Sequence, residues 1–68
     1  MIIDRMIIED IMAEKQMTFS QLAMSTGIAK QNISAIIRRG TCTPKTAGKI
    51  AAGLSVQVNE IRGKAESA

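Results

Sequence analysis

The sequence predicts an all-α fold, a compact bundle of five short helices, and three observations support this prediction. Apolar residues recur at steps of three and four along most of the 68-residue chain, the spacing that places them on one face of a helix. Thr and Gly residues stand at the ends of several of these runs, as helix caps do. No segment alternates apolar and polar residues for the length of a strand.

The first two helices can be placed from their caps and apolar faces. The first is expected over residues 3–15, where Asp4 lies near the N-terminus and suits the helix dipole. Its buried face would hold five apolar residues, Ile3, Ile7, Ile8, Ile11 and Met12. The second helix is expected to begin after Thr18, because Gln21 three residues later completes a capping-box pattern. It should end at Gly27, which can take a left-handed conformation.

Three more helices follow. The third is expected over residues 29–38, the fourth begins at Pro44, and the fifth is expected over about residues 58–63, with a frayed tail at 64–68. Gly40 should close the third helix. The fourth helix begins cleanly, because Thr43 is a good N-cap and Pro44 suits the first helical position. Gly48 and Gly53 lower the intrinsic stability of this helix.

Composition restricts the class of protein. A chain of 68 residues, 46% of them hydrophobic, is expected to form one domain over residues 1–68. With no His and with Cys42 as the one cysteine, we expect no disulfide, no zinc site and no cofactor. Without a Ser–His or Cys–His pair, we also expect no enzyme. No apolar run approaches the roughly 18 residues of a membrane span, so we expect a cytoplasmic protein with no membrane partner.

Charge is distributed unevenly along the chain. The net charge of +3 is modest, but no acidic residue occurs between Lys15 and Asn59. The same segment contains the cations Lys15, Lys30, Arg38, Arg39, Lys45 and Lys49. A segment of one sign suits a polyanionic partner. An unevenly charged, solvated surface would explain the pattern equally well, so charge alone does not decide between the two interpretations.

The second and third helices are the informative pair. A helix of about eight residues, a turn with Gly27 and another helix describe a helix-turn-helix over about residues 18–38. Ala23 is small enough to let the two helices approach, and Ile28 and Ile33 would fill the corner between them. The second helix of the pair would then protrude and could enter a DNA major groove about 12 Å wide.

Short motifs in this region occur in a characteristic order. They are "LA" (Leu22, Ala23), "TGI" (Thr26–Ile28), "IS" (Ile33, Ser34), Gly40 with Pro44, "KIA" (Lys49–Ala51) and "LSV" (Leu54–Val56). Together they resemble the lambda-repressor-like, Cro/repressor-type helix-turn-helix family, also called XRE-like regulators. The resemblance covers about residues 7–61 and implies a five-helix DNA-binding domain. It also implies a transcriptional regulator, which we expect to be a repressor of phage or mobile-element type.

The resemblance assigns roles to residues of this chain. The recognition helix would be residues 29–38, lying in the major groove. Bases would be contacted by Lys30, Gln31, Asn32, Ser34 and Ala35. Phosphates would be contacted by Thr18, Ser20, Gln21, Arg38, Arg39, Thr41, Lys45 and Thr46. The expected partners are an operator in double-stranded DNA and a second copy of the chain, a homodimer at least on DNA. No small-molecule ligand is expected.

The chain departs from the family pattern at three places. Phe19 replaces the Gln that often anchors on phosphate, so that contact is lost or moves to Ser20 or Gln21, and Phe19 becomes a candidate core residue. One extra residue precedes Gly40, so the recognition helix should either run on or bulge near Arg38.

The third departure involves two positions. Many members have an Arg late in the first helix and a Glu late in the recognition helix, and these form an ion pair. The matching residues here are Met12 and Ile37. Losing one partner strands a buried charge, whereas replacing both with apolar residues can be neutral. We therefore predict that Met12 and Ile37 touch.

Two alternatives remain open. The fold could serve as a protein-interaction module that does not bind DNA, although the acid-free middle segment argues against it. Cys42 could be a redox sensor rather than a free thiol with no role.

A 68-residue chain leaves no room for a ligand-sensing domain, so it would be a small stand-alone regulator or a fragment of a longer repressor.

Overall fold

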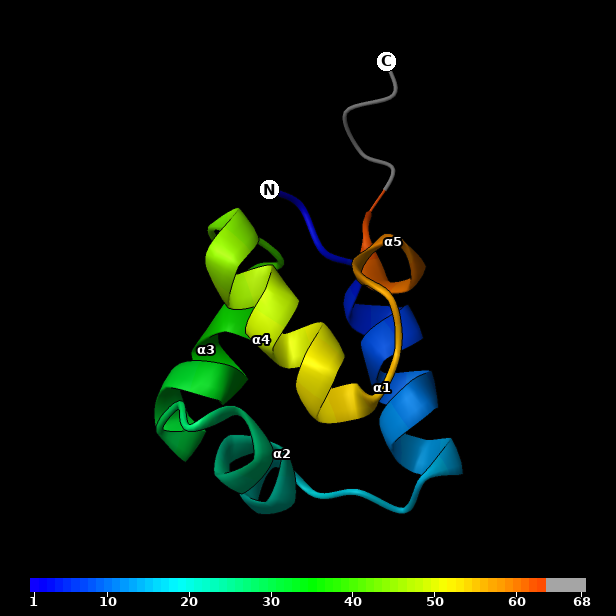
Figure 1. Ribbon diagram of the computed structural model, residues 1–68, viewed down its shortest axis with the longest axis vertical. Helices are drawn as coiled ribbons and strands as arrows, with labels where there is room; N and C mark the ends of the chain where they lie inside the picture. The colour runs from blue at the N-terminus through cyan, green and yellow to red at the C-terminus, as the bar shows by residue number, and fades with distance from the viewer. Residues whose placement is uncertain (64–68) are drawn as a thin grey trace.

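The computed structural model describes residues 1–63, which form five helices around one core (Figure 1). They are α1 (Arg5–Glu14), α2 (Phe19–Thr26), α3 (Lys30–Arg39), α4 (Pro44–Leu54) and α5 (Val58–Ile61). The expected all-α, five-helix fold is confirmed. The expected fraying of residues 64–68 lies outside the described residues. Among helices α1 to α5, none is long and apolar enough to cross a membrane.

Helix α1 begins at Arg5, two residues later than the expected start at residue 3. The cause is Asp4, whose carboxylate accepts hydrogen bonds from the amides of Met6 and Ile7, at 2.9 and 3.2 Å. Asp4 is therefore the N-cap residue, so Ile3 lies outside the helix.

Residues 1–3 instead form an extended N-terminal strap. Ile2 forms an isolated antiparallel bridge with Thr41, and Ile3 forms one with Arg62. The amide of Ile3 donates to the carbonyl of Gly40 at 2.9 Å, and the side chain of Ile3 is only 3% exposed. The strap thus ties the loop after α3 to the end of α5, a long-range pairing that helical periodicity could not reveal.

The caps of α2 to α4 form as predicted. Thr18 and Gln21 make both hydrogen bonds of the capping box, and Thr43 caps α4 with Pro44 in its first turn. Gly27 ends α2 and Gly40 ends α3 in the left-handed conformation, with φ of 77° and 81°. These positive φ angles suit glycine, because a Cβ atom makes that conformation costly.

The core is aliphatic and draws on every helix. Its fully buried side chains of large volume are Ile8, Leu22, Ile33, Ile37, Ile50, Leu54 and Ile61. Met12 of α1 and Ile37 of α3 are both buried in it, 6% and 1% exposed. Helices α1 and α3 contact each other. Direct contact between the Met12 and Ile37 side chains remains a prediction.

Gly53 allows α4 to pack closely on α2. A Cβ atom at this position would lie 2.7 Å from Cγ2 of Thr26 and 3.1 Å from Cδ1 of Leu22. A Cβ atom added at Gly48, in the same helix, would have no atom within 4 Å outside the neighbouring backbone of α4. Both glycines lower the helix propensity of α4, but only Gly53 is required by close packing against another helix.

Candidate nucleic-acid interface

A three-residue turn, 27–29, joins α2 to α3. The Gly27 amide donates to the carbonyl of Ala23 at 2.8 Å, and the Thr26 hydroxyl donates to the same carbonyl at 3.2 Å. The Thr26 hydroxyl also accepts from the amide of Ile28, at 3.2 Å. Because one threonine side chain bonds on both sides of Gly27, the relative placement of α2 and α3 is held by short, local interactions.

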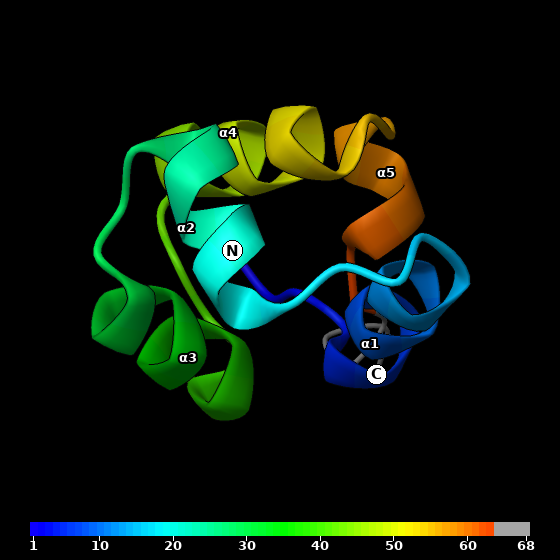
Figure 2. The same ribbon diagram turned by 90° about the horizontal axis from the view of Figure 1, so that it is seen from below.

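Helix α3 lies at one edge of the molecule, with one side open to solvent (Figures 1 and 2). Ile33 and Ile37 point into the core and are 0% and 1% exposed. Lys30 and Gln31 are exposed, as are Asn32 and Ala35, while Ser34 is partly buried. The side of α3 opposite Ile33 and Ile37 is thus not covered by the rest of residues 1–63.

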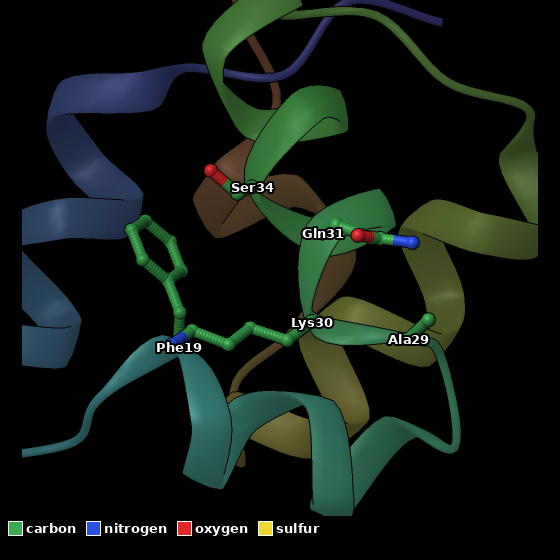
Figure 3. A pocket seen from close by; sticks show the side chains of 5 residues that line it. All are labelled: Phe19, Ala29, Lys30, Gln31 and Ser34. Carbon is green, nitrogen blue, oxygen red and sulfur yellow. The ribbon is translucent and has the colours of Figure 1, made fainter.

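Two shallow pockets flank the exposed side of α3. The first pocket is lined by Phe19, Ala29, Lys30, Gln31 and Ser34 (Figure 3). The second pocket is lined by Ile28, Asn32, Ala35, Ile36, Arg39, Thr46 and Lys49. The five residues expected to contact bases divide between these pockets, and neither pocket contains an acidic residue.

The residues expected to contact phosphate fall into two groups. Thr18, Ser20 and Gln21 are exposed at the start of α2. The Thr18 hydroxyl accepts from the Gln21 amide at 3.1 Å, and the Gln21 side-chain oxygen accepts from the Thr18 amide at 2.8 Å. Both side-chain oxygens act as acceptors in the capping box, so the Thr18 hydroxyl proton and the side-chain NH₂ of Gln21 remain as donors.

The second group lies where α3 meets α4. Arg38, Arg39, Thr41 and Lys45 are exposed there, and Thr46 is partly buried. Arg39 and Thr46 meet at the second pocket, whereas Arg38 lies on the other side of α3, with its guanidinium 3.4 Å from the hydroxyl of Ser34. Thr41 and Lys45 line neither pocket.

Comparison with protein families agrees with this geometry. The family model of the Cro/C1-type HTH DNA-binding domain matches residues 8–63. The chain belongs to this family. It is therefore a DNA-binding transcription regulator at the level of the family, and the family is not one of enzymes. No curated protein and no solved structure shows significant similarity to the chain.

In this Cro/C1-type domain, α3 is a regular helix despite the extra residue before Gly40. The amide of Gly40 donates to the carbonyl of Ile36 at 2.9 Å, the ordinary spacing of an α-helix. Helix α3 continues to Arg39, one residue beyond the expected end. Of the two expected outcomes, the helix runs on and does not bulge, so Arg38 and Arg39 keep helical positions.

The structure adds three charged residues that the sequence interpretation did not assign to the interface of this Cro/C1-type domain. Lys49 lines the second pocket together with Asn32 and Arg39. Its spacing of three from Thr46 and four from Lys45 places it on their side of α4, a signal that was available in the sequence.

The other two charged residues come from α1. Arg5 and Glu9 form an ion pair, with Nε 2.9 Å from Oε2, and they line a third pocket with Phe19, Ser34, Ile37 and Arg38. Glu9 therefore lies next to the cationic residues of α3, and the positive charge of Arg5 offsets its negative charge. This could not be read from the sequence, because α1 lies far from α3 along the chain.

Cys42 is half-buried between α3 and α4 and is a free thiol. Burial raises its pKa above the ordinary value, an effect that outweighs the opposing charges of the N-terminal ammonium group and of Arg39. A raised pKa lowers the fraction of thiolate at a given pH, whereas sensor cysteines have a lowered pKa. Within residues 1–63, no group of three or more His, Cys, Asp or Glu residues could hold a metal ion.

Phe19 is neither a core residue nor fully exposed. It packs against the core cluster but remains half-buried, and its side chain lines the first pocket. Figure 3 shows its ring between α1 and α3, with the Lys30 side chain extending toward it. The expectation of a core role for Phe19 therefore accounts for only part of its surface.

Proposed function

We propose that this Cro/C1-type domain binds double-stranded DNA in a sequence-specific manner, with α3 inserted in the major groove. The observation that carries the proposal is the exposed, acid-free side of α3 between two cationic pockets. A single α-helix fits the width of the major groove. DNA would attract this surface because its phosphates carry the opposite charge.

Lys30 and Gln31 are the principal base-reading residues in this proposal. They occupy the first turn of α3, and both side chains are exposed. Gln can bond adenine N6 and N7 together, and Lys can bond guanine O6 and N7. Asn32, Ser34 and Ala35 complete the set, and Ala35 would lie against a thymine methyl group.

Phosphates would be held on both sides of the groove. Thr18, Ser20 and Gln21 would contact one strand from the start of α2, where free amides and the helix dipole favour anions. The second group would contact the other strand from the α3–α4 junction; it comprises Arg38, Arg39, Thr41, Lys45, Thr46 and Lys49. These contacts would set affinity and register rather than sequence preference.

As a regulator, the chain would act on an operator as a homodimer and would repress transcription. Two copies on one duplex would read half-sites about one helical turn apart, because the two recognition helices must enter successive turns of the groove. A DNA-binding regulator works where the DNA is, so the expected location remains the cytoplasm.

Selection of bound sites from a random duplex library tests this proposal. The wild-type chain should enrich a defined half-site, and Gln31→Ala should change the preferred base at one position while leaving the others. Lys15→Ala is the matched control, because Lys15 is exposed at the C-terminal end of α1 and lines neither of the two pockets beside α3. Recovery of unselected sequences by the wild type would contradict sequence-specific binding.

Salt dependence separates the proposal from a protein-interaction module. Binding to random duplex should weaken steeply as salt rises, with a slope of about −0.9 per neutralised phosphate in a log–log plot. A module that has lost DNA binding would show little affinity even at low salt.

A further inference from the structure

Phe19 is the one aromatic residue of the chain, and the structure leaves part of its ring accessible. Besides the first pocket, the side chain lines the third pocket and another formed by Glu9, Met12, Ala13, Met17 and Thr18. A ring that served only to fill the core would be enclosed. This one packs on the core from one side and presents apolar surface on another.

The accessible part of the ring lies beside the proposed base-reading residues. Phe19 lines the first pocket together with Lys30, Gln31 and Ser34 of α3. Figure 3 shows the Lys30 side chain extending toward Phe19 and the Gln31 side chain directed away from it. Lys30 and Arg38 both border this ring, in the first and third pockets. An apolar wall edged by two cations matches one chemical feature of the major groove, a thymine methyl group close to the phosphate backbone.

We propose that Phe19 is a specificity-determining residue that receives a thymine methyl group in the first pocket. This inference rests on the proposed function and adds one base preference to it. Ala35 lines the second pocket and not the first, so its proposed methyl contact would lie at a different place along α3. The two apolar contacts would therefore govern two different positions of the half-site.

Parallel selections from a random duplex library test the inference, using the wild type, Phe19→Leu and Phe19→Ala. The wild type and Phe19→Leu should enrich thymine at one position, and Phe19→Ala should accept any base there. Met24→Ala is the matched control, because Met24 is also on α2, is 84% exposed and lines neither pocket. It should select the same sites as the wild type.

Replacing the thymine by uracil in the selected duplex isolates the methyl group. The wild type should lose affinity about fourfold, the effect expected for one buried methyl-sized group. Phe19→Ala should lose less than twofold. This ratio compares two duplexes with one protein, so lower stability of the variant does not alter it.

The outcomes distinguish the inference from the proposed function. If Phe19→Ala keeps the thymine preference and the full uracil effect, the role of Phe19 is refuted while DNA binding stands. If the wild type enriches no sequence, both are refuted.

Discussion

Gly48 and Gly53 of α4 have different surroundings, although the local sequence does not distinguish the two positions. At Gly53 a Cβ atom would lie 2.7 Å from Cγ2 of Thr26. This methyl group cannot move aside easily, because the Thr26 hydroxyl is hydrogen-bonded to Ala23 and Ile28. At Gly48 no atom lies within 4 Å of the added Cβ.

Gly53→Ala should therefore lower the free energy of unfolding by about 1–2 kcal/mol, the cost of overpacking less the gain in helix propensity. Gly48→Ala is its matched control and should raise it by about 0.5–1 kcal/mol. Denaturant melts followed by circular dichroism measure both values. Equal stabilisation by the two substitutions would show that α4 and α2 are not in close contact at Gly53.

The raised pKa of Cys42 has a direct chemical consequence. Burial favours the neutral thiol in the folded state, so less thiolate is present at a given pH than for an exposed cysteine. Alkylation of Cys42 should be slower than that of a small free thiol at the same pH. Its rate should rise with pH over a higher range, as rate measurements against pH would show. A faster reaction would revive the redox-sensor interpretation.

The raised pKa of Cys42 also makes the stability of the folded protein depend on pH. A group whose pKa is raised by folding stabilises the protein below its unfolded pKa, and this stabilisation is lost as pH rises toward the folded value. The stability of the wild type should thus fall at alkaline pH more than that of Cys42→Ala.

At the scale of the helix, the start of α2 combines a structural role with a proposed role in phosphate binding. The Thr18 side chain accepts a hydrogen bond from the Gln21 amide, and the Gln21 side-chain oxygen accepts one from the Thr18 amide. Thr18→Ala removes one of these bonds and should lower the free energy of unfolding by about 1 kcal/mol. Ser20→Ala is a control on the same helix turn, because Ser20 is exposed and is not part of the cap. A thermal melt would detect the difference; equal stabilities would show that the capping box contributes little.

Helix α3 ends in a pair of arginines whose proposed role is electrostatic. Arg38→Ala and Arg39→Ala should each weaken DNA binding about equally for all sequences and reduce the salt slope by about 1. The measurement is the affinity for random duplex at several salt concentrations, with Lys15→Ala as the control. An unchanged slope would place that arginine away from phosphate.

Helix boundaries were predictable from sequence where the capping interactions involve residues close together in the chain. Thr18, Gly27, Gly40 and Thr43 act within one turn of themselves, and each performs the predicted role. The start of α1 was predicted wrongly, because Ile3 has the spacing of a helix residue but bonds to Gly40 across the fold.

At the scale of the whole molecule, the overall fold was predictable because the five apolar faces are each readable from periodicity. The residues proposed to contact bases were named only through the family pattern, and in the structure all of them except the partly buried Ser34 are exposed on α3. One edge of the surface was not predictable, because Arg5 and Glu9 reach it through packing between helices distant in sequence. Lys49 could have been assigned from its spacing to Lys45 and Thr46 in the same helix. The exposure of Phe19 also depends on how α1, α2 and α3 meet.

The central claim is that the open side of α3 is the surface that lies on DNA. Titrating isotopically labelled protein with the selected duplex, while recording backbone amide chemical shifts, tests it most directly. We predict the largest changes in residues 30–35, smaller ones at 18–21 and 38–49, and little change at Glu14 or along α5. Large changes confined to α1 and α5, with α3 unaffected, would contradict the account.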